Sequence, residues 1–118
     1  MRFQRSQGFE AVGSLVSPGE TADGVLPELE RALERRDFAA LGELFIRRAL
    51  DGDVHGVGTL LARGYLRGIP AVELHEKIVT PAMHLIGERW RSGELTVADE
   101  HIATQTTLDA LTRLQPEL

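Results

Sequence analysis

The amino-acid sequence predicts an all-α protein, a four-helix bundle that follows a flexible N-terminal lead-in. Three observations predict this fold class. Apolar residues recur at spacings of three and four over most of the chain, which is the period of an amphipathic helix. No segment has the strict alternation of a half-buried strand, and no Asn-Gly hairpin turn is present. Short polar or glycine-containing breaks divide the periodic segments, as expected for helices joined by short loops.

The composition indicates one acidic, cytoplasmic domain. The chain has 118 residues, of which 42% are hydrophobic and 26% charged, and this suits a single globular domain with its own core. Its net charge of -5 argues against direct contact with nucleic acid, because surfaces that bind nucleic acid are basic. The absence of cysteine excludes disulfides and thiol catalysis. No apolar run approaches the length of a membrane span, and none resembles a signal peptide.

The N-terminal part of the chain differs in composition from the rest. Residues 1–24 hold Gly, Ser, Pro and Thr with few large apolar side chains, so we expect a flexible lead-in there and a domain over residues 25–116. The segment PELERALERR at 27–36 is charged nearly all round, and Pro27 suits the first turn of a helix. We interpret this segment as an outer helix or a leader to the bundle.

Two helices are predicted next, at 38–50 and 54–66. Asp37 can cap the first of them. The residues that share its apolar face are Phe38, Leu41, Phe45 and Ala49. The apolar residues of the second helix, with the same period, are Val57, Leu60 and Leu61. Glycines within the second helix weaken it by up to about 1 kcal/mol each unless packing requires a close approach.

The longest periodic segment, 71–91, is predicted to be a well-buried helix. The residues of its apolar stripe are Val72, Val79, Met83, Ile86 and Trp90. Pro81 lies inside this segment, and a proline in a helix interior removes a hydrogen bond and clashes with the preceding turn. We therefore expect a kink at Pro81, or two helices.

The last helix, predicted at 97–115, begins after a turn at Gly93 and a capping-box pattern formed by Thr96 and Asp99. One face of this helix carries six residues at spacings of three and four, apolar at the far end and polar near the turn. These residues are Val97, His101, Thr104, Leu108, Leu111 and Leu114. Glu100 lies at the edge of this face. Burying an unpaired Glu and His would cost several kcal/mol, so these groups face water, pair with each other or face a ligand.

The string DVHGVG at 53–58 matches D-x-H-x-x-G, a cobalamin signature of Rossmann-like corrinoid domains. In those domains the string follows a buried strand, whereas here it follows a predicted helix and its stop. A helical chain of this length has no room for a doubly wound parallel sheet. We therefore interpret Asp53 as a helix cap and His55 as a residue of the first turn.

Trp90, followed after nine residues by Glu100 and His101, resembles the W-x9-E-H motif of the helical cap domains of cobalamin-binding proteins. The similarity extends to the strings RALDGD, LLARGYLRG and IVTPAMHLIGERWRSGELTVADEHIAT, and covers about residues 38–115. Caps with this motif look most like those of the light-sensing, adenosylcobalamin-dependent transcriptional regulators, many of which are fused to a MerR-type DNA-binding domain. The caps of methionine synthase share the fold but not the motif.

The resemblance implies a four-helix cap over the upper face of cobalamin, which a Rossmann-like domain holds from below. By position, Trp90 would lie over the corrin edge beside the adenosyl group, and Val97 would pack against that group. Glu100 and His101 would contact it. The implied cofactor is adenosylcobalamin, bound together with a Rossmann-like domain that lies in a longer chain or is supplied in trans, because these 118 residues contain no such domain.

The implied function is that of a photoreceptor module and not of an enzyme. Light would break the cobalt–carbon bond, and the protein would respond to the loss of the adenosyl group by regulating transcription. The residue types suit this role: the Glu100 carboxylate can accept both hydroxyls of a ribose diol, and the imidazole of His101 can donate or accept. Trp90 offers a rigid apolar surface for a flat partner.

One position departs from the family pattern. The light sensors can carry a His directly after the Trp, where it is available to the cobalt after photolysis. The residue here is Arg91, so the resemblance does not imply a cobalt ligand from this cap.

Two other functions fit the same sequence. A cap of a corrinoid methyl-transfer protein would shield a methyl group with apolar residues, which the polar Glu100 and His101 argue against. A helical interaction scaffold that has lost its ligand would fit Arg91, although packing alone does not require Trp90 with Glu100 and His101. An exposed ligand face could also pair two caps as a homo-oligomer.

The remaining polar residues receive structural interpretations. His75 and His84 lie roughly 180° apart on their predicted helix, so they cannot share a metal ion, and we predict no metal site. The pair Arg47 and Arg48 is expected on a solvated face, as short charge clusters usually are.

Overall fold

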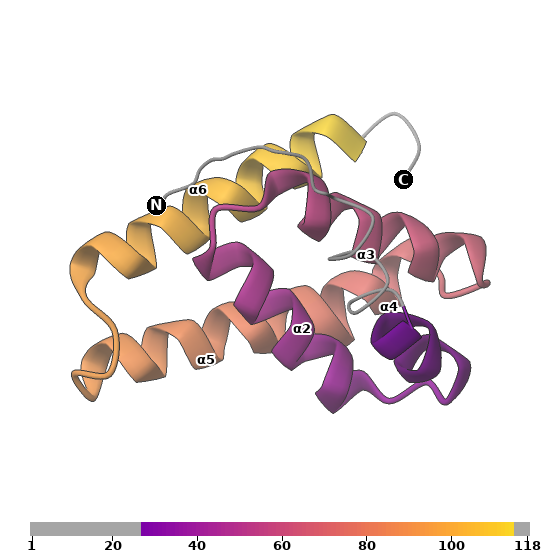
Figure 1. Cartoon of the computed structure of the whole chain (residues 1–118), viewed down its shortest axis with the longest axis horizontal. Coiled ribbons are helices and arrows are strands. Elements are labelled where there is room, and N and C mark those ends of the chain that lie inside the picture. The colour runs from indigo at the N-terminus through magenta and orange to yellow at the C-terminus, as the bar shows by residue number, and fades with distance from the viewer. Residues whose placement is uncertain (1–26, 115–118) are drawn as a thin grey trace.

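A computed structural model describes residues 27–114 of the chain, and over this range the predicted all-α fold is confirmed. The described helices are a first helix at 27–34, α2 (Phe38–Leu50), α3 (Val54–Leu66), α4 (Ala71–Leu74), the π-helical turn η1 (His75–Val79), α5 (Thr80–Arg91) and α6 (Val97–Leu114) (Figure 1). The boundaries predicted for the helices at 38–50 and 54–66 are confirmed. The predicted lead-in at 1–24 lies outside the described residues.

Helix α2 lies at the centre of the bundle and packs against α3, η1, α5 and α6 (Figure 1). Helix α3 also packs against α4 and α6, and α5 and α6 form a hairpin. The core draws buried apolar side chains from every helix. The largest of them include Leu33, Leu41, Phe45, Ile46, Leu60, Leu61, Leu74, Ile78 and Ile86. None of the helices within residues 27–114 is long and apolar enough to cross a membrane.

The helix at 27–34 packs on the bundle as an outer helix that contributes to the core, and it is not a leader. Leu29 and Leu33 are fully buried, so a stripe only two large residues wide is enough to dock an otherwise charged helix. Its C-terminus closes with Arg36 in the left-handed region at φ 52, the Asp37 amide donating to the Ala32 carbonyl. Asp37 then caps α2, as predicted, by accepting from the Ala40 amide at 3.1 Å.

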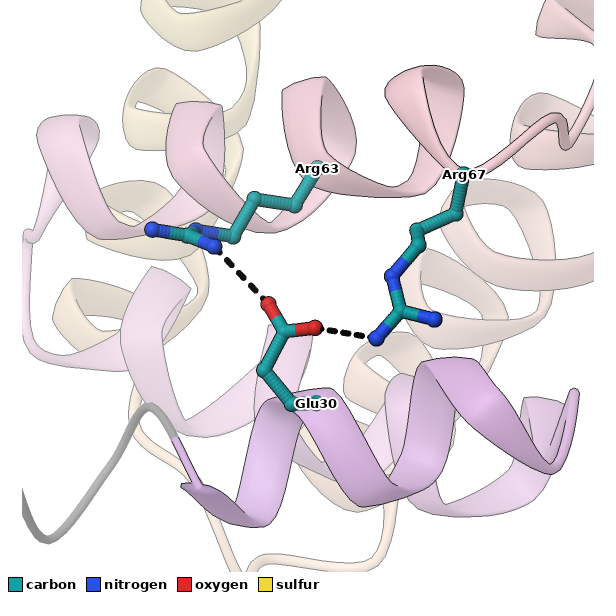
Figure 2. A network of polar contacts seen from close by, with 3 residues as sticks. All are labelled: Glu30, Arg63 and Arg67. Carbon is teal, nitrogen blue, oxygen red and sulfur yellow. Dashed lines mark hydrogen bonds and ion pairs between the residues drawn. The ribbon is translucent and has the colours of Figure 1, made fainter.

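An ion-pair network joins the first helix to α3 (Figure 2). The Glu30 carboxylate accepts from Arg63 Nη1 at 2.8 Å and from Arg67 Nη2 at 2.5 Å. The hydrogen bond from Arg67 is the main cause that lowers the pKa of Glu30, with Arg63 adding to it and partial burial opposing it. The carboxylate therefore holds Arg63 of α3 and Arg67, the residue directly after this helix, against the first helix.

The helical stretch from 71 to 91 continues through Pro81, and a π-helical turn precedes the proline where a kink or a break was predicted. The Thr80 amide donates to the His75 carbonyl, five residues back, as in a π-helix. The wider turn places Pro81 in the first turn of α5, where its missing N–H is tolerated.

The junction of α2 and α3 is organised around a buried arginine. Arg48 was expected on a solvated face, but its side chain is buried and its Nη1 donates to the Gly56 carbonyl at 3.0 Å. Burial lowers the pKa of Arg48, and the nearby charge of Asp53 acts in the opposite direction. Asp53 caps α3 by accepting from the Gly56 amide at 2.8 Å, and His55 is an exposed residue of the first turn. The structural interpretation of the D-x-H-x-x-G string is therefore confirmed.

Two glycines of α3 differ in the space around them. A Cβ added at Gly64 would lie 2.9 Å from Leu74 Cδ2 in the core, so α3 and α4 approach closely there. A Cβ added at Gly58 would meet no heavy atom within 4 Å. Close packing thus accounts for Gly64 and not for Gly58.

We predict opposite effects of alanine at these two positions. Gly64→Ala should lower the free energy of unfolding by roughly 1–3 kcal/mol, because Leu74 must move within a filled core. Gly58→Ala should raise it by up to about 1 kcal/mol through helix propensity alone. Urea denaturation measures the free energy of unfolding of both variants. Equal effects of the two substitutions would refute the close approach of α3 and α4.

The network around Glu30 predicts a pH-dependent contribution to stability. Glu30→Gln should cost about 0.5–1 kcal/mol near neutral pH, a small value because all three side chains are partly solvated. Since the pKa of Glu30 is lower in the folded chain, its contribution is complete above the unfolded pKa and is lost as pH falls through the folded pKa. Thermal unfolding from about pH 6 to about pH 3 should show the variant and the wild type converging. Glu34→Gln, an exposed position in the same helix, is the control for the loss of one carboxylate.

Candidate functional site

The hairpin between α5 and α6 is held by hydrogen bonds within its own turn. Gly93 takes a φ of 90 after the end of α5, a conformation that a glycine adopts without strain. The Thr96 amide donates to Asp99 Oδ2 at 3.0 Å, and the Asp99 amide donates to Thr96 Oγ1 at 3.0 Å. This reciprocal pair is the predicted capping box, and it fixes where α6 begins.

Two arginines at the end of α5 form ion pairs, one with α2 and one within α5. Arg89 Nη2 donates to Glu43 Oε2 of α2 at 3.1 Å and so ties the hairpin to the centre of the bundle. Arg91 Nη2 donates to Glu88 Oε2 at 2.7 Å, and this hydrogen bond is the main cause that lowers the pKa of Glu88. The guanidinium of Arg91 is therefore drawn back along α5.

The face that α6 buries does not coincide with the face on which its apolar residues recur. The residues of α6 that are buried are Ala103, Thr106, Thr107 and Ala110. Of the predicted stripe, Val97, His101 and Leu108 are exposed, while Thr104, Leu111 and Leu114 are half-buried. Small side chains let α6 pack against α2 and α3, and this contact leaves Val97 and Leu108 exposed while Leu111 and Leu114 pack at the edge of the core.

The predicted burial of the apolar stripe on 71–91 is also corrected at two positions. Val72 and Trp90 are exposed, whereas Val79 and Ile86 are buried and Met83 is half-buried. Both exposed residues lie near an end of the helical stretch, where fewer neighbouring helices cover it. Trp90 is therefore an exposed aromatic residue at the hairpin end of the bundle.

The register of the α5–α6 pair places Trp90 and Glu100 at the same level. Thr107 Oγ1 lies 3.6 Å from Met83 Sδ, which fixes the pairing of the two antiparallel helices. Trp90 and Glu100 each lie seven residues from this contact toward the hairpin, and seven residues are almost two full turns. The indole and the carboxylate thus belong to corresponding positions of neighbouring helices.

The four residues predicted to contact a ligand lie at the hairpin end, and most of their surface is open. Trp90 is 43% exposed and Val97 66% exposed. His101 is exposed and Glu100 half-buried. Within residues 27–114 no hydrogen bond or ion pair joins these four side chains, and Glu100 Oε2 accepts from Thr104 Oγ1 at 3.1 Å. The hairpin end therefore carries an aromatic ring, an apolar side chain, an anionic acceptor and an imidazole on α5 and α6, and we call these four residues the hairpin face.

A hollow, which the sequence did not predict, lies between α3 and the C-terminal half of α6. Its volume is about 240 Å³. The lining residues are Val54, His55, Gly58, Thr59, Ala62, Ala110, Arg113 and Leu114. The sequence offered no specific signal for this hollow. Its lining includes small residues, but small residues are common wherever helices pack. In the part of the chain that the structure describes, no three His, Asp or Glu side chains gather as metal ligands would.

Comparison with known proteins places this bundle in context. The family model of the B12 binding domain matches residues 41–115, which include α3 and the whole α5–α6 hairpin. The HTH-type transcriptional repressor CarH of Myxococcus xanthus is 40% identical over 40 residues. This alignment covers 34% of the chain but only 13% of the length of CarH, so it compares a segment and not two whole proteins.

The capping box predicts how firmly the hairpin is fixed. Thr96→Ala should lower the free energy of unfolding by about 1 kcal/mol, because the Asp99 amide loses its side-chain acceptor. Thr112→Ala in the same helix is the control. The Thr112 hydroxyl donates a hydrogen bond to the Leu108 carbonyl, one turn earlier in α6. Such bonds slightly destabilise helices, so this change should be neutral or slightly stabilising. Chemical denaturation followed by circular dichroism measures both, and an unaffected Thr96→Ala would refute the cap.

Proposed function

The chain belongs to the B12 binding domain family, and we propose that it is the cap over the upper, adenosyl-bearing face of cobalamin in a light-responsive regulator of transcription. The cap in this proposal comprises residues 25–116. The observation that carries it is the hairpin face, where Trp90 and Glu100 lie at one level of neighbouring helices with Val97 and His101 open beside them.

The side chains of the hairpin face fit an adenosyl group. An adenosyl group combines a flat aromatic base with a ribose diol, so it needs an apolar surface and hydrogen-bond acceptors close together. The exposed parts of Trp90 and Val97 supply apolar surface, which loses water when a ligand covers it. The Glu100 carboxylate accepts only the Thr104 hydroxyl among the described residues and keeps lone pairs for further donors.

Each side chain has a distinct part in this proposal. Trp90 would cover the edge of the corrin beside the adenosyl group. Val97 would pack against that group, while Glu100 would accept from its hydroxyls and His101 would donate to it or accept from it. When bound, adenosylcobalamin supplies a cobalt–carbon bond that light can break. The chain itself breaks no bond in this account: it binds the upper ligand and responds to its loss.

Partners follow from the same proposal. Domains of this family usually pair with a Rossmann-like cobalamin-binding domain, so we propose that such a domain holds the cofactor from below. The name of CarH as a transcriptional repressor supports a regulatory output for the whole assembly. Arg91, which is bonded to Glu88, replaces the histidine that light sensors can carry there, and we assign it no role as a cobalt ligand.

The proposal predicts that Glu100 distinguishes the upper ligand. In the dark, with a cobalamin-loaded Rossmann-like domain supplied in trans, adenosylcobalamin should quench Trp90 fluorescence saturably, and hydroxocobalamin should do so weakly. Glu100→Gln should lower the affinity for adenosylcobalamin about tenfold, which corresponds to one charge-assisted hydrogen bond of about 1.4 kcal/mol. The same substitution should leave the affinity for hydroxocobalamin unchanged.

The matched control for this titration is Asp109→Asn, an exposed acid on the same helix that lies away from the hairpin face. Free tryptophan amide, titrated in parallel, corrects for light absorbed by the corrin. Quenching that is equal for both cobalamins, or equally weakened by Glu100→Gln and Asp109→Asn, would count against the proposal. No quenching in any mixture would favour the helical scaffold that has lost its ligand.

A further inference from the structure

The outward stripe of α6 is an apolar and uncharged surface without a partner in the bundle. It consists of Val97, His101, Thr104 and Leu108, with Val97 66% and Leu108 52% exposed. Large apolar side chains this exposed, with no Asp, Glu, Lys or Arg between them on the stripe, are typical of protein interfaces, whose centres are depleted of charge. We call these four residues the α6 stripe.

The spacing of the α6 stripe is the same in both directions along the helix. Its residues are separated by four, three and four positions, which is the alternation of a coiled-coil seam. The stripe covers about 16 Å of helix, at 1.5 Å per residue. If a second copy of α6 lies antiparallel to the first, Val97 faces Leu108 at both ends and His101 faces Thr104 twice in the middle.

The antiparallel arrangement is better matched than the parallel one. Parallel copies would place His101 against His101 and would align the two helix dipoles unfavourably. Antiparallel copies give each imidazole a hydroxyl. Thr104 Oγ1 already donates to Glu100 Oε2 at 3.1 Å, so its free lone pairs can accept from the ring N–H of the other copy's His101.

Charge also selects this surface for contact between two copies. The chain carries a net charge of -5, so two copies repel each other across most orientations. The α6 stripe avoids this repulsion, and its flank at Ala98, Gln105 and Thr112 is uncharged as well. Glu100 on the other flank would face an uncharged part of the second helix.

We propose that the α6 stripe joins two copies of this chain in an antiparallel, two-fold symmetric dimer. A symmetric dimer uses the same patch on both subunits, and the stripe is self-complementary in this sense. One helix–helix contact is smaller than the roughly 1,000 Å² of a stable interface, so we expect a dissociation constant on the order of 0.1 mM. The dimer covers Val97 and His101, so it would compete with cobalamin; this competition alone rests on the proposed function.

The experiment measures self-association of the full chain without cobalamin, so its outcome does not depend on the proposed function. Sedimentation equilibrium should show the 13.0 kDa chain approaching twice its mass at high concentration. Val97→Glu and Leu108→Lys should each weaken the dimer at least tenfold. An equimolar mixture of the two variants should restore it. In the mixed dimer the introduced carboxylate faces the introduced ammonium at one end, while the unchanged Leu108 and Val97 meet at the other.

Two controls make the result specific. Ile102→Lys changes another exposed apolar residue of α6, 42% exposed and on a different face, and should leave the dimer intact. The inverted pair, Val97→Lys with Leu108→Glu, replaces any variant that circular dichroism shows to be unfolded. A chain that stays monomeric at millimolar concentration, a mixture that does not re-associate, or an Ile102→Lys effect as large as that of Leu108→Lys would each overturn the proposal.

Discussion

The close packing of α6 through small side chains is the constraint on which the surface of this protein depends. Ala103, Thr106, Thr107 and Ala110 are the buried residues of the helix, and they bring its backbone near α2 and α3. A helix that buries such residues cannot also bury the opposite side, so its bulkier apolar residues face outward. Burying the large residues instead would gain more area but would separate α6 from the helices that it now contacts. The exposure of the hairpin face and of the α6 stripe both follow from the packing of α6 through its small residues.

The rest of the hairpin keeps that surface in a fixed position. The reciprocal bonds of Thr96 and Asp99 set the first turn of α6, and Arg89 ties the end of α5 to Glu43 of α2. The backbone that carries Trp90 and Glu100 is therefore fixed without a ligand, which would lower the entropic cost of the proposed binding. Surface that is held open in this way must meet water, a ligand or another protein. In our account cobalamin and a second copy of the chain use overlapping parts of it, and mass action between them would set the fraction of caps free to bind.

Much of the fold could be predicted from the sequence, because caps and breaks are local signals. Asp37, Asp53 and the Thr96–Asp99 pair mark helix starts through hydrogen bonds to amides three residues away, and the structure confirms them. Periodicity was less reliable, since it shows which residues share a face but not which face the core takes. On α6 it identified a shared face whose Val97 and Leu108 are exposed, and burial of Arg48 could not be predicted because its acceptor, the Gly56 carbonyl, comes from the next helix. The candidate site residues came from the family resemblance, and only the contact between Met83 and Thr107 shows that Trp90 and Glu100 share a level.

Hydroxyl-radical footprinting in the dark tests most directly whether the hairpin face covers the adenosyl group. Trp90 and Tyr65 are equally exposed, at 43% and 44%, but Tyr65 lies near the end of α3, away from the hairpin. With a Rossmann-like domain loaded with adenosylcobalamin, we predict that oxidation of Trp90 and His101 falls while oxidation of Tyr65 is unchanged. Illumination before labelling should restore the labelling of Trp90. Equal oxidation of Trp90 with and without the adenosyl group would contradict the account.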